Sequence, residues 1–176
     1  ANIGTTFSCT HIEPATESSK DVEAAKRVDT LLNRTFIEPI LGLGYPQKDL
    51  PVLKKLNNYI LEDDLNNLDF DFDFIGLQCY TREVVKSAML IPYIGAELVS
   101  AEKRNVISTE MGWEVYPPAL YHVLEKFNKY DGIKKIIITE NGAAFPDTVT
   151  NGKVFDIKRT HYIQDHLEQI LKAKKN

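Results

Sequence analysis

A short β-branched segment, Lys134–Thr139 (KKIIIT), constrains the fold of this chain more than any other feature. Its three consecutive isoleucines leave no polar face, which is typical of a strand buried in a parallel sheet. The segment leads directly into the polar turn Glu140-Asn141-Gly142. Functional groups of parallel sheets gather at the carboxyl ends of the strands, so this strand predicts a functional position at its end.

Strand-like and helix-like segments alternate along the whole chain, which predicts an α/β fold with a parallel sheet. Strands are predicted from alternating or β-branched runs over residues 3–9, 70–80 and 134–139. Helices are predicted from apolar spacing and from serine or proline at their starts, over residues 21–36, 51–61, 119–130 and 156–174. Residues 62–69 are predicted to be a solvated loop, and residues 81–113 an irregular segment.

Charge and composition exclude several classes of partner. The 176 residues carry 21 Lys and Arg against 25 Asp and Glu, which gives a net charge of −4 and no support for a nucleic-acid surface. No apolar run approaches the ~18 residues that a membrane-spanning helix needs. We therefore expect neither nucleic acid nor a membrane as a partner.

The ends and the cysteines bear on localisation. Cys9 and Cys79 are expected to be reduced thiols, which slightly favours a cytoplasmic location. The opening residues show no signal peptide and no initiator methionine. We expect the chain to begin part-way through a longer protein, so its localisation is left unknown.

Glu140 is the first candidate for chemistry. Period-two counting along the strand places Ile136, Ile138 and Glu140 on one face, so the carboxylate is expected to point the same way as two core isoleucines. At the end of a buried strand it would emerge where catalytic groups of parallel sheets gather. From the residues alone, a loop or capping carboxylate is the alternative interpretation.

Other polar and aromatic residues carry weaker signals. Gln78 and Tyr80 end the strand over residues 70–80 and share one face of it. Core packing, with the phenol bonded to a backbone group, is the simpler interpretation of Tyr80. Trp113, the only tryptophan, is either a packing anchor or a platform for a ligand.

No metal or cofactor is expected. The four histidines show no spacing typical of metal ligands; they are His11, His122, His161 and His166. Gly42-x-Gly44 lacks the third glycine and the strand-to-helix context of a dinucleotide site.

Taken together, the motifs resemble glycoside hydrolase family 1, which contains β-glucosidases, 6-phospho-β-glycosidases and plant myrosinases. The resemblance covers essentially the whole chain, and the matching segments come in the family's order. They are Pro14 through Ala25, Asn33 through Pro39, Gly44-Tyr45-Pro46, Asp73 through Thr81, Met111 through Pro117, and Ile138-Thr139-Glu140-Asn141-Gly142. The last segment resembles the nucleophile motif of the family and is the most specific of them.

The resemblance implies a role for each site residue. Glu140 is expected to be the catalytic nucleophile of a retaining β-glycosidase, and Tyr80 to hydrogen-bond and orient it. Gln78, Trp113 and Asn141 are expected to bind the β-linked glycoside substrate, with Trp113 on the aglycone side. Gln78 departs from the asparagine that is usual in the family, and so its hydrogen bond is made by a longer side chain.

The resemblance also implies what is missing. It places residues 1–176 at roughly strands five to seven of a (β/α)8 TIM barrel, as an incomplete catalytic domain without the N-terminal half and the last strand. The acid/base motif Asn-Glu-Pro of the family does not occur in the chain, and Glu38-Pro39 follows Ile37 at a helix end, so it is no substitute. The chain alone is therefore expected to be inactive.

Two further interpretations stay open. The chain is alternatively a non-catalytic βα interaction module that needs the remaining barrel segments or a complementary chain to cover its strand edges. The parent is alternatively a 6-phospho-β-glycosidase, because the phosphate ligands of that subgroup would lie after the last strand of the barrel.

Overall fold

The computed structural model describes residues 1–175 and shows alternating strands and helices. The strands are β1 (Gly4–Ser8), β2 (His11–Pro14), β3 (Phe74–Gln78), β4 (Arg82–Ser87), β5 (Ala96–Leu98), β6 (Ile136–Glu140), β7 (Val149–Thr150) and β8 (Lys153–Val154). The α-helices are α1 (Ser19–Asp29), α2 (Thr35–Ile40), α3 (Asp64–Leu68), α4 (Pro118–Phe127) and α5 (Ile157–Ala173). A π-helical turn, Thr30–Arg34, joins α1 to α2, and a 3-10 helix covers Pro51–Asn58.

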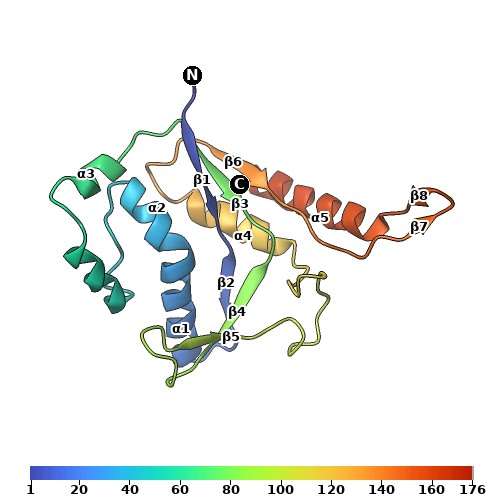
Figure 1. The fold of residues 1–176 in the computed structure, drawn as a ribbon, viewed down its shortest axis with the longest axis horizontal. Coiled ribbons are helices and arrows are strands. Elements are labelled where there is room, and N and C mark those ends of the chain that lie inside the picture. Colours follow the sequence, from blue (N-terminus) through green and yellow to red (C-terminus); the bar gives the residue numbers. More distant parts are fainter. Residues whose placement is uncertain (176) are drawn as a thin grey trace.

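The central element is a parallel three-stranded sheet in the order β1-β3-β6 (Figure 1). Helices α2, α4 and α5 pack on one of its faces and enclose the main core. That core consists of aliphatic, aromatic and thiol side chains, among them Ile37, Ile75, Leu77, Cys79, Leu120 and Phe127. The predicted strands and their parallel order are thus found where the sequence placed them.

Strand β6 is less buried than its apolar sequence predicts. Ile136, Ile137 and Ile138 are half-buried, although Ile136 and Ile138 pack against the main core. The reason is topological, because β6 forms one edge of the three-stranded sheet and β1 forms the other. An apolar strand is buried when it has a neighbour on each side, but at the edge of a sheet it is partly exposed.

A second sheet, β2-β4-β5, continues from the first (Figure 1). Strands β2 and β4 are parallel, β4 and β5 are antiparallel, and α1 packs on them through Ala24, Ala25 and Val28. The prediction that residues 81–113 are irregular is therefore wrong in part. Val84 and Val85 are buried by pairing with residues far apart in the sequence, which no local pattern reveals.

The helices differ from the prediction mainly at their ends. The first helical segment continues through the π-helical turn to Ile40, four residues beyond the predicted end. The predicted loop over residues 62–69 contains the short helix α3. In α5, Ile163 and Leu167 are exposed, whereas Tyr162 and His166 on another face are almost completely buried.

Gly76, in the middle of β3, allows two non-adjacent strands to meet. The hydroxyl oxygens of Thr6 in β1 and Thr139 in β6 lie 2.7 Å apart, on the face of the sheet opposite the main core. A Cβ atom on Gly76 would lie 2.9 Å from the Cβ atom of Thr6 and 2.8 Å from the Cγ2 atom of Thr139. The missing side chain is what allows this contact above β3.

Gly76→Ala is therefore expected to lower the free energy of unfolding by about 1–3 kcal/mol, the usual cost of an overpacked site. Urea denaturation measures the change. Gly142→Ala is the matched control, because a Cβ atom at Gly142 meets no heavy atom within 4 Å. Equal stability of the two variants would contradict the role assigned to Gly76.

Candidate active site

The predicted site residues meet at the carboxyl ends of two neighbouring strands. Gln78 is the last residue of β3, Tyr80 follows two positions later, and Glu140 is the last residue of β6. The Gln78 side chain donates from Nε2 to Oε1 of Glu140 at 2.9 Å, and the Tyr80 hydroxyl donates to Oε2. Each carboxylate oxygen thus has its own donor, and the Glu140 side chain remains exposed.

An irregular register brings these side chains to one face. Leu77 pairs with Ile138 in the regular register. Gln78 then pairs with Glu140, which skips Thr139. Strict alternation would direct Glu140 toward the helices, beside Ile138. The prediction that Glu140 shares the face of the core isoleucines is therefore wrong, and the β-bulge is the physical reason.

The phenol of Tyr80 is protonated at neutral pH. The hydrogen bond to Glu140, then burial and the charge of that carboxylate, raise the pKa of Tyr80 to about 12. Ionisation would remove the donated proton and place two negative charges side by side. Tyr80 therefore acts as a donor to Glu140 over the whole physiological range.

Trp113 lies beside Tyr80, with ring centroids 5.4 Å apart and planes 42° from each other. The two rings help to line a cavity of about 210 Å³ that Ser8, Thr10 and Glu83 also border. The indole is 37% exposed, so one part of it packs and another part faces solvent. This position of Trp113 is compatible both with a packing anchor and with a platform for a ligand.

A buried ion-pair network holds the Trp113 segment, and sequence reasoning missed it. Glu114 is only 5% exposed and accepts two hydrogen bonds from Arg82, both at 2.9 Å. Arg104 adds an ion pair at 2.7 Å. Burial alone would raise the pKa of Glu114, but the two guanidinium groups outweigh it and lower that pKa.

Asn141 faces the helical layer rather than open solvent. Its Nδ2 atom donates to the Cys79 carbonyl at 2.8 Å and to the Tyr162 hydroxyl at 3.3 Å. The structure therefore engages the amide nitrogen within the protein. The contact of Asn141 with substrate stays a prediction. The side-chain oxygen, Oδ1, would have to make it.

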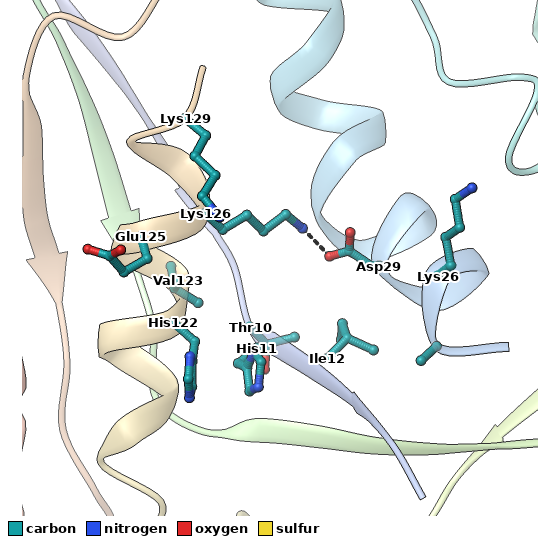
Figure 2. A pocket seen from close by; sticks show the side chains of 11 residues that line it. Thr10, His11, Ile12, Lys26, Asp29, His122, Val123, Glu125, Lys126 and Lys129 are labelled. Carbon is teal, nitrogen blue, oxygen red and sulfur yellow. Dashed lines mark hydrogen bonds and ion pairs between the residues drawn. The ribbon is translucent and has the colours of Figure 1, made fainter. Parts of the chain in front are cut away.

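A larger cavity, about 370 Å³, lies between α1 and α4 and contains none of the predicted site residues (Figure 2). Lys126 reaches across it to Asp29, and the His11 and His122 rings stack with centroids 4.5 Å apart. Burial, followed by repulsion from His122, lowers the pKa of His11 to about 4. The two histidines thus form a packing contact, while His122 remains exposed on α4.

Residues 1–175 contain neither a cluster of metal-ligating side chains nor a membrane-spanning helix. Within this range no group of three or more His, Cys, Asp or Glu side chains could hold a metal ion. In the same residues no helix is long and apolar enough to cross a membrane.

Comparison with known proteins finds relatives along almost the whole chain. Beta-glucosidase A from Acetivibrio thermocellus is 35% identical over 180 residues, covering 98% of this chain and 39% of that protein. A 6-phospho-beta-galactosidase from Clostridium acetobutylicum is 29% identical, covering 92% of this chain and 39% of its own length. The solved family 1 β-glucosidase from Thermotoga maritima superposes with a TM-score of 0.87 at 33% identity, over 99% of this chain and 39% of that one.

These relatives establish both the fold and the family of the chain. The chain spans about two-fifths of the length of the curated relatives it matches, and the solved structures that it resembles are TIM barrels. The predicted fold class, a partial (β/α)8 barrel, is confirmed. The family model described as glycosyl hydrolase family 1 matches residues 1–176. The chain therefore belongs to glycosyl hydrolase family 1.

Proposed function

We propose that residues 1–176 form an incomplete catalytic domain of a retaining β-glycosidase of the β-glucosidase type, with Glu140 as nucleophile. One observation carries the proposal. The Glu140 carboxylate is exposed at a strand end, and Gln78 and Tyr80 each donate to a different one of its oxygens. A carboxylate fixed in this way keeps a lone pair free to react and has little freedom to rotate.

The proposed chemistry uses two carboxyl groups in two steps. One Glu140 oxygen attacks the anomeric carbon while the glycosidic bond breaks and a second carboxylic acid, about 5 Å away, protonates the leaving oxygen. Water then attacks the glycosyl-enzyme, and the second group, now a carboxylate, takes its proton. Gln78 and Tyr80 orient the nucleophile in both steps, and Trp113 borders the cavity proposed for the aglycone.

Residues 1–176 supply only the first of these groups in the proposal. Glu38, which precedes Pro39, lies in α2 and is 8% exposed. It accepts hydrogen bonds from Arg34 at 2.5 Å and from Tyr130 at 3.1 Å, so it serves the helical layer. We infer that the acid belongs to a segment outside this chain and that residues 1–176 alone hydrolyse no glycoside.

Covalent labelling tests the assignment of Glu140. A chimera, here named the completed barrel, carries residues 1–176 in place of the matching segment of the Acetivibrio thermocellus protein. Treatment with a 2-deoxy-2-fluoro-β-glucoside that bears an activated leaving group is expected to trap a glycosyl ester. Peptide mapping by mass spectrometry is expected to find the label on Glu140. A label on another residue, or a folded chimera that neither labels nor hydrolyses aryl β-glucosides, would refute the assignment.

A second candidate function, an interaction module, is favoured by the exposed apolar surface. Phe36 and Leu43 are 54% and 62% exposed near α2, and Leu167 and Leu171 are 53% and 59% exposed on α5. Strands β1 and β6 are the two edges of the parallel sheet, so each has one side without a strand partner in residues 1–175. Such surface usually marks a contact with further polypeptide, here the remaining barrel segments or a complementary chain. Light scattering after size exclusion tests this, because a well-folded monomer would argue against obligatory assembly.

Two classes of substrate are candidates, plain β-glycosides and 6-phospho-β-glycosides. Similarity to a 6-phospho-beta-galactosidase keeps the phosphorylated glycosides as the alternative substrate class. Comparing aryl β-glucoside with aryl 6-phospho-β-glucoside on the natural full-length protein separates the two, since hydrolysis of only one identifies the class.

A further inference from the structure

We infer that Tyr162 is a positioning residue for the nucleophile: its buried hydroxyl joins the two chain segments that carry Tyr80 and Glu140. The inference rests on the function proposed for Glu140. Tyr162 lies in α5 and is 1% exposed. Its hydroxyl donates to the Tyr80 carbonyl at 2.7 Å and accepts from Asn141 at 3.3 Å. These two hydrogen bonds are called the Tyr162 bridge below.

The Tyr162 bridge lies where the regular ladder between β3 and β6 stops. The Cys79 amide donates to the Glu140 carbonyl at 3.2 Å, just beyond the register irregularity. Past this bond, in residues 1–175, side chains join the two segments: Asn141 donates to the Cys79 carbonyl, and Tyr162 connects Asn141 with Tyr80. Backbone pairing therefore does not fix the site geometry by itself.

Tyr80 is consequently held at both ends. Its hydroxyl donates to the Glu140 carboxylate, and its carbonyl accepts the Tyr162 hydrogen. Asn141, the residue after Glu140, is held by the same tyrosine. A displacement of either segment changes the separation of the Tyr80 hydroxyl and the carboxylate, and a displacement of about 1 Å in a reacting group can cost 10²-fold in rate.

The ring of Tyr162 is itself fixed by its helix. His166, one turn later, stacks on it with centroids 3.9 Å apart and planes 28° from each other. The His166 ring donates from Nδ1 to the Tyr162 carbonyl at 2.7 Å. Arg159, one turn earlier, donates to the Ala143 carbonyl at 2.9 Å. One face of α5 thus contacts the segment that follows the nucleophile at several points.

Tyr162→Phe isolates the bridge, because it removes one oxygen atom and keeps the stacked ring. The readout is the pKa of the Tyr80 phenol in residues 1–176, followed by NMR of tyrosines labelled with ¹³C at Cζ. The Glu140 hydrogen bond holds this pKa at about 12 in the native chain. In the variant we expect it to fall by at least one unit toward its ordinary value of about 10.

Tyr130→Phe is the matched control. Tyr130 also has a hydrogen-bonded hydroxyl in the helical layer, but it donates to Glu38. We expect this variant to leave the Tyr80 pKa unchanged. A Tyr162→Phe chain that folds and keeps the native Tyr80 pKa would overturn the inference. If that variant does not fold, Asn141→Ser removes the other half of the bridge, and an unchanged pKa there overturns it equally.

Kinetics of the completed barrel add a second readout. Tyr162→Phe is expected to lower kcat roughly 10-fold with little change in KM, since positioning acts on the reacting carboxylate rather than on substrate binding. Tyr130→Phe is expected to keep the native kcat. A failure of the proposed function would appear separately, as a glycosyl label absent from Glu140, because the Tyr80 titration needs no catalysis.

Discussion

Glu140→Gln in the completed barrel is expected to lower kcat for aryl β-glucosides by roughly 10⁴- to 10⁶-fold, the range typical when a group of the reacting constellation is removed. The amide has the shape of the carboxylate and still offers one oxygen to the donors Gln78 and Tyr80. It lacks the negative charge that attacks the anomeric carbon, so no glycosyl-enzyme can form. Steady-state kinetics and intact-mass analysis measure the two consequences.

Glu168→Gln provides the control for this prediction. Glu168 is an exposed carboxylate on α5, so its replacement changes the net charge equally without touching the site. The control is expected to keep native kcat and native labelling. Hydrolysis at more than about one-hundredth of the native rate by a folded Glu140→Gln barrel would show that Glu140 is not the nucleophile.

Glu114→Ala is expected to lower the free energy of unfolding of the chain by about 3 kcal/mol. The substitution removes a carboxylate that is 5% exposed and leaves the Arg82 and Arg104 guanidinium groups without it. Breaking a buried ion pair usually costs 3–5 kcal/mol, and the lower end applies because Arg82 keeps its bond to Glu13 at 2.6 Å. Urea denaturation at neutral pH measures the difference.

The pH dependence of the same variant checks the cause. Because the pKa of Glu114 is lowered in the folded chain, its contribution is present above the ordinary carboxyl pKa of about 4.3 and is lost as pH falls below it. The native chain and Glu114→Ala should therefore converge in stability on acidification. Glu97→Ala, which breaks an exposed pair with Lys86, is expected to show little change at any pH. A constant difference between native and Glu114→Ala would contradict the electrostatic explanation.

Local sequence patterns were sufficient for the elements that carry the site. The isoleucine run predicted β6, and alternation over residues 70–80 predicted that Gln78 and Tyr80 point to the same side, as their common contact with Glu140 shows. Both patterns report the environment of one strand at a time. They therefore predicted the carboxyl ends of β3 and β6 to within two residues without any knowledge of the neighbouring strand, but not the face on which Glu140 lies.

Features that arise between segments could not be predicted in this way. The pairing of β2 with β4 joins residues about 70 positions apart, and the contact of Arg82 with Glu114 joins residues 32 positions apart. Tyr162 lies 82 positions from Tyr80, on a buried face of α5 that it shares with His166. Each depends on tertiary packing, which the local apolar period does not encode.

The irregular register of β3 and β6 makes the pairing of β6 as important as the identity of its residues. Without the bulge, the same residues in regular register would pair Gln78 with Thr139 and turn the Glu140 carboxylate into the helical layer, beside Ile138. A conservative substitution that keeps the bulge leaves the carboxylate with Gln78 and Tyr80. The register of β6 thus encodes the direction of the Glu140 carboxylate, and tolerance of this strand to a change of register should be much lower than its tolerance to changes in side chain.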